Sequence, residues 1–136
     1  MPKEATVERA KAKLRQGKRP TTAAGEFVRE EIEHIRKGEH GARSPKQAIA
    51  IGLSKARRAG VPLPPPEKGQ VSEKTRRSAE LAYEVGQKER RPRSSSAKRS
   101  KAVRKALERE PHSAASKRAL SAQARRAAAR RKSRGR

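Results

Sequence analysis

The sequence predicts an all-α protein: a small antiparallel helical hairpin at about residues 22–60, followed by a basic arm that is largely disordered or transiently helical. Two observations predict the hairpin. Helix start and stop signals flank residues 44–60, and an apolar stripe of helical spacing precedes them. Composition predicts the disorder. The chain has 38 Lys and Arg against 14 acidic residues, and only 31% hydrophobic residues, too few to offset the entropy lost on ordering the whole chain.

The first helix of the hairpin is predicted from an N-cap at Thr21 or Thr22 to about Lys37, with Gly38 as its stop. One face carries Val28, Ile32 and Ile35, with Phe27 at its edge. We interpret the glutamates of this helix as a solvated face that balances nearby Lys and Arg, rather than as an acid/base or metal cluster; they are Glu26, Glu30, Glu31 and Glu33.

The second helix is the stretch SPKQAIAIGLSKARRAG at residues 44–60. Ser44 is a predicted N-cap, Pro45 suits the first helical position, and Gln47 completes a capping box. Gly60 is suited to the left-handed position after the helix, and Pro62 prevents continuation. A row of small residues spaced by four lets the first helix approach closely; the row consists of Ala48, Gly52 and Ala56.

Five segments are predicted along the chain. They are a basic N-terminal segment with a short helix (1–20), the hairpin (21–60), a proline-rich linker (61–71), an isolated helix (72–90) and a low-complexity Lys/Arg/Ala/Ser arm (91–136). Alanine and arginine favour helix, so parts of the arm, 97–109 and 114–132, are expected to be intermittently helical and to become more so on a polyanion.

The net charge of +24 is concentrated near the end of the chain, where residues 90–136 carry 18 basic and 2 acidic groups. Such a field predicts a polyanionic partner, most simply nucleic acid, with DNA favoured over RNA. One Phe and one Tyr are too few for base stacking, so contact with the phosphate backbone is expected. The predicted contact residues are Arg90, Arg91, Arg93, Lys98, Arg99, Lys101, Arg104, Lys105, Arg125, Arg126, Arg130, Arg131, Lys132, Arg134 and Arg136 in the arm, and Lys46, Arg57 and Arg58 in the hairpin.

An enzyme is the class of function with the least support. The chain has three His but no Asp or Cys, and too little core for a water-poor pocket, so we predict no catalytic residues and no small-molecule substrate. A metal site of Glu30, His34 and His40 fits no recurring ligand pattern, and no metal or cofactor is predicted. No apolar run is long enough for a membrane span or a signal peptide, so we expect no membrane association and a cytoplasmic, nucleoid-associated location.

Residues 25–66 also carry a resemblance, on the sequence GEFVREEIEHIRKGEHGARSPKQAIAIGLSKARRAGVPLPPP. This stretch resembles the shared segment of a family of small basic bacterial proteins of unknown function that have a KQAIAIGLSKARRAG-type helix. The resemblance implies a bacterial origin and no particular activity. The region after Arg90 is similar, in composition alone, to the tails of linker-histone-like nucleoid proteins.

Three alternatives remain open. The helix at 44–59 could read bases in a major groove, although its arginines cluster at the end opposite to the usual reading positions, so a folding or protein-contact role is favoured. The whole protein could be an interaction module that docks through apolar helix faces, with its tail on ribosomal RNA or an acidic partner. In a nuclear protein, RRPR or RRKSRGR would read as an import signal.

Overall fold

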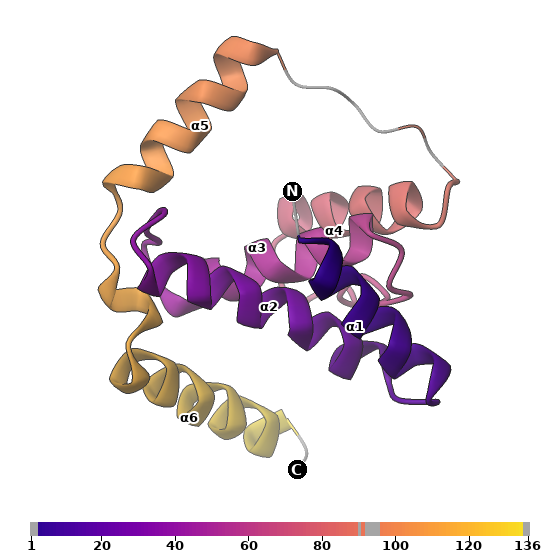
Figure 1. Ribbon diagram of the computed structural model, residues 1–136. Helices are drawn as coiled ribbons and strands as arrows, with labels where there is room; N and C mark the ends of the chain where they lie inside the picture. Colours follow the sequence, from indigo (N-terminus) through magenta and orange to yellow (C-terminus); the bar gives the residue numbers. More distant parts are fainter. Residues whose placement is uncertain (1–2, 90, 92–95, 135–136) are drawn as a thin grey trace. The chain divides into compact units, whose positions relative to one another are not determined.

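The computed structural model describes residues 3–89, 91 and 96–134 (Figure 1). Over these ranges the elements are all helical apart from an isolated bridge between Lys68 and Val71. None of the helices in the described ranges has the length and apolar character needed to cross a membrane. In chain order the helices are α1 (Glu4–Arg15), α2 (Pro20–Arg36), α3 (Pro45–Arg58), α4 (Glu73–Gly86), α5 (Ala97–Arg109), the 3₁₀ turn η1 (Ser113–Ala115) and α6 (Lys117–Arg134).

The prediction of a largely disordered arm is wrong, because the arm forms α5, η1 and α6. Both long helices begin at a serine N-cap: Oγ of Ser96 accepts a hydrogen bond from the amide of Arg99 at 3.2 Å, and Oγ of Ser116 accepts one from the amide of Ala119 at 3.1 Å. These caps add to the high helix propensity of the Ala and Arg residues that follow.

The prediction of a simple hairpin is also wrong, because α2 and α3 each contribute to two compact units. Unit 1 consists of Met1–Glu31 and Ala50–Ser94, and unit 2 consists of Ile32–Ile49 and Ser95–Arg136. The chain outside the hairpin buries more apolar surface than its few large apolar residues predict. Alanines in α1, α4 and η1 supply the missing contacts.

The core of unit 1 is built on Phe27, which is 1% exposed. It packs with alanines of α1, α2 and α3 and with Val61 and Leu63 of the proline-rich segment. Helices α2 and α3 approach closely at Gly52, where an added Cβ would lie 2.6 Å from Cα of Val28, so α3 can cross α2 there only without a side chain. The predicted small-residue row therefore does mediate a close helix crossing.

The core of unit 2 is built on Ile35, which is fully buried with Ala42, Ala48, Ala114 and Ala115. Nε of Arg36 donates to the carbonyl of Ala115 at 2.9 Å. The loop after α2 is also fixed to the arm, because the amides of Gly41 and Ala42 donate to the carbonyls of Leu107 and Pro111 at 2.8 and 3.0 Å. Two alanines of η1 thus anchor the basic arm.

The predicted boundaries of the second hairpin helix are confirmed. The amide of Gln47 donates to Oγ of Ser44 at 3.2 Å, and Oε1 of Gln47 accepts from the amide of Arg43 at 2.7 Å, one residue before the N-cap. At the other end Gly60 has φ of +102°, the left-handed conformation that glycine adopts at lowest cost.

Candidate nucleic-acid interface

The basic residues of α6 lie around its whole circumference. At about 100° per residue, Arg118, Arg125 and Lys132 fall into one row along the helix, while Arg126 and Arg130 fall on another side, about 100° to 140° away. All five are exposed. An amphipathic helix would reserve one face for a core, whereas α6 presents cations in most directions.

Helix α5 is organised differently, with its three lysines on one side and its apolar groups on the other. Lys98, Lys101 and Lys105 share one side and are exposed. Val103, 56% exposed, lies opposite and lines a shallow hollow with Arg99, Ser100, Arg104 and Leu107. Arg104 of this helix forms an ion pair with Glu108, but the pair is long, with 3.8 Å between Nε and Oε1, and both side chains are exposed. Water screens such a pair, so it removes little of the positive field.

Two glutamates of α2 in unit 1, Glu26 and Glu31, are by contrast buried against bases of their own unit. The carboxylate of Glu26 is 6% exposed and lies 3.0 Å from Nε of Arg9 and 2.5 Å from Nζ of Lys13. The hydrogen bond from Lys13, followed by that from Arg9, lowers the pKa of Glu26 despite the opposing effect of burial. Glu31, 1% exposed, pairs with Lys55. The interpretation of this helix face as solvated is therefore wrong for Glu26, Glu30 and Glu31, which are buried, whereas Glu33 is exposed. The predicted balance with nearby Lys and Arg is present at Glu26 and Glu31.

Comparison with protein families finds a match within the chain. A model described as a family of unknown function, DUF6496, matches residues 21–68. The match spans α2, α3 and the proline-rich segment, and it ends before α4. No curated protein and no solved structure matches the chain.

The hairpin residues assigned to the interface differ in their surroundings. Lys46 and Arg58 are exposed, at the start and end of α3. Arg57 is 8% exposed, and its guanidinium donates to the carbonyls of Leu63 and Pro64, each at 3.2 Å. Burial lowers the pKa of Arg57. Its donors hold the proline-rich segment against α3, so we leave Arg57 out of the proposed interface.

The arm residues assigned to the interface divide between α5, α6 and positions outside them. Arg91 is exposed between α4 and α5. Arg90, Arg93 and Arg136 lie outside the described residues. The remaining arm residues are on α5 (Lys98, Arg99, Lys101, Arg104 and Lys105) and on α6 (Arg125, Arg126, Arg130, Arg131, Lys132 and Arg134).

Sequence reasoning missed how the arm is anchored, although the signals are present. Ser96 and Ser116 each precede a run rich in Ala and Arg, the usual position of an N-cap. Ala114 and Ala115 form a small apolar pair inside a polar segment and are buried in unit 2. A helical-wheel analysis that considers only large apolar residues does not identify such alanines as core positions.

Proposed function

We propose that this protein is a non-enzymatic, nucleic-acid-associated protein of the nucleoid-associated type, whose helices α5 and α6 bind the phosphate backbone with little sequence specificity. One observation carries the proposal: the exposed cations surround α6, while Glu26 and Glu31 are buried against bases within unit 1. Cations displace the condensed counterions of a polyanion, and this drives binding without a shaped site.

Duplex DNA is the partner that this geometry suits best. Helix α6 has 18 residues and is about 27 Å long. The major groove of B-DNA, about 12 Å wide, admits an α-helix, whereas the major groove of duplex RNA is deep and narrow. A helix in the DNA groove has phosphates on both sides, so rows such as Arg118 with Arg125, and Arg126 with Arg130, can each face a strand.

The docking alternative has weaker support, since the chain itself covers the apolar faces it would use. Phe27 is 1% exposed and Ile35 is fully buried, each in the core of its own unit. A partner would have to displace these contacts. We therefore retain phosphate binding as the single proposed function.

A binding comparison tests the proposal. Fluorescence anisotropy with two unrelated DNA duplexes of equal length, a duplex RNA and a single strand would be measured at two salt concentrations. We expect the two DNA duplexes to bind equally and more tightly than the other probes. A difference above about tenfold between the two DNA duplexes would show base reading, since one mismatched base pair in a specific site costs about 1–3 kcal/mol. Absence of binding at low salt would refute the proposal.

A further inference from the structure

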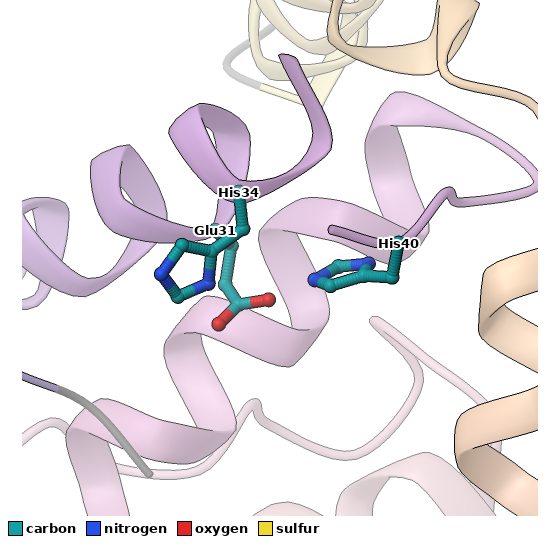
Figure 2. Close-up of side chains that lie close together, drawn as sticks. All are labelled: Glu31, His34 and His40. Carbon is teal, nitrogen blue, oxygen red and sulfur yellow. The ribbon is translucent and has the colours of Figure 1, made fainter. Parts of the chain in front are cut away.

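Glu31, His34 and His40 lie on one stretch of ten consecutive residues, formed by the last turns of α2 and the loop that follows. Figure 2 shows their side chains turned toward one another. A carboxylate oxygen and one ring nitrogen from each histidine lie within 4.8 Å of one another. Glu31 is 1% exposed, the side chain of His34 is 13% exposed, and His40 is half-buried. We propose that these three residues bind a divalent transition metal ion, with Zn²⁺ as the best candidate.

The donor set fits this class of metal. Two imidazole nitrogens and a carboxylate oxygen are ligands that Zn²⁺ commonly takes, and they leave a fourth tetrahedral position open to a ligand from solvent. Glu31 and His34 are three residues apart, so the helix itself places them on one face. Ligand atoms on a tetrahedral zinc lie about 3.4 Å apart, which requires shifts of about 1 Å from the arrangement here. Rotation about side-chain bonds supplies shifts of that size.

A second contact orients the His40 imidazole. Nδ1 of His40 lies 2.9 Å from the carbonyl oxygen of Gly41. A carbonyl can only accept, so in the neutral ring the proton is on Nδ1 and the lone pair is on Nε2. Nε2 of His34 lies 3.6 Å from Oε2 of Glu39, an ion-pair distance that is longer than a hydrogen bond. Metal-binding histidines usually donate their other ring N–H to a carbonyl or carboxylate, as His40 does.

The ion pair between Glu31 and Lys55 is compatible with metal binding. It uses Oε1 of Glu31, and a carboxylate has about four lone-pair sites on its two oxygens. Ligating carboxylates are themselves commonly hydrogen-bonded, which orients them. The Lys55 ammonium also repels a cation, so we expect an affinity below that of closed structural zinc sites.

The test is a titration of the full chain, without a histidine tag, with ZnCl₂ in a calorimeter. Co²⁺ provides a second readout, because tetrahedral cobalt has strong visible absorption bands. The variants are His34→Gln and His40→Gln, and the matched control is His112→Gln, which changes a histidine outside the cluster. Helix content and the thermal unfolding midpoint are measured without metal, so that only folded variants are compared.

We expect one Zn²⁺ per chain, a loss of at least about tenfold in affinity for each of the two cluster variants, and no change for His112→Gln. Zn²⁺ should also raise the unfolding midpoint of the unmodified chain, since it binds the folded state. Unchanged affinity in either cluster variant, an equal loss in His112→Gln, or binding weaker than about 1 mM would overturn the proposal. The assay contains no nucleic acid, so its outcome is independent of the proposed function.

Discussion

Nζ of Lys13 lies 2.5 Å from Oε1 of Glu26, and this ion pair joins α1 to α2 at a carboxylate that is only 6% exposed. Arg9, one helical turn earlier, contacts the other oxygen of the same carboxylate at 3.0 Å. Two bases spaced by four on α1 thus neutralise one buried acid on α2. Alone, α1 would be marginal as a helix. Its place in unit 1 depends on this charge pairing together with the packing of Ala10.

We predict that Lys13→Met destabilises the protein by about 1–3 kcal/mol, because it removes one of two bases from a buried carboxylate. The matched control is Lys11→Met. Lys11 forms a 3.9 Å pair with Glu8 in which both side chains are more than half exposed, and such pairs contribute at most about 1 kcal/mol. Urea unfolding measures both variants. Equal effects would show that the buried pair contributes no more than an exposed one.

The same carboxylate predicts a dependence of stability on acid. The pKa of Glu26 is lowered in the folded state from an ordinary value of 4.5. Its contribution to stability is therefore present above pH 4.5 and is lost as the pH falls through the folded pKa. We expect Glu26→Gln to be less stable than the unmodified protein at pH 7, with a difference that shrinks toward pH 3. A difference that is constant across this range would contradict the assignment.

Gly52 provides a test of the helix crossing. Alanine has a higher helix propensity than glycine by about 1 kcal/mol, yet Gly52→Ala would push a methyl group against the backbone of Val28. We expect a net loss of about 1–3 kcal/mol. Gly25→Ala is the control, because Gly25 lies in α2 with nothing within 4 Å of an added Cβ, so this change should be neutral or stabilising. The thermal unfolding midpoint should fall for Gly52→Ala and should be unchanged or higher for Gly25→Ala.

Arg57 and Arg58 are adjacent in sequence and have different roles in the structure. Arg57→Lys should lower stability by about 1–3 kcal/mol, since one ammonium cannot reproduce two guanidinium hydrogen bonds to the carbonyls of Leu63 and Pro64. Arg58→Lys, at an exposed position, should change stability by less than about 0.5 kcal/mol. Chemical unfolding with both variants checks this. A larger loss of stability for Arg58→Lys than for Arg57→Lys would contradict the role of Arg57 in holding the proline-rich segment against α3.

Local signals in the sequence predicted individual elements better than their packing. The cap at Ser44, the stop at Gly60 and the close approach at Gly52 all follow from short-range stereochemistry, and all are present. The burial of Glu26 could not be predicted from such short-range signals. A helical wheel places Glu26 on the polar face of α2. That face is buried because α1 packs against it and pairs Arg9 and Lys13 with the carboxylate.

The candidate sites show the same division. A count of charges locates the basic arm, but it does not distinguish exposed Arg58 from buried Arg57, because burial depends on the chain returning past α3 at Leu63. Glu31 and His34 are three residues apart, so their position on one helix face could be predicted from the sequence. His40 joins it through the geometry of the loop after α2, which no periodicity predicts.

The most direct test of phosphate binding by α6 is the salt dependence of its affinity for duplex DNA. Two triple variants remove the same charge from different sides of the helix: Arg118→Gln with Arg125→Gln and Lys132→Gln, and Arg126→Gln with Arg130→Gln and Arg131→Gln. Glutamine keeps helix propensity, and all six positions are exposed, so the fold should be unchanged. Anisotropy would be measured for both variants and the unmodified chain between 50 and 200 mM salt.

For the unmodified chain we expect about 6 to 10 phosphate contacts, with a log–log slope of about −0.9 per contact and a loss of about 10³ to 10⁵ in affinity over this range. Each triple variant should lower the magnitude of the slope by about one to three units, on both unrelated duplexes alike. An unchanged slope in both variants would contradict phosphate binding by α6.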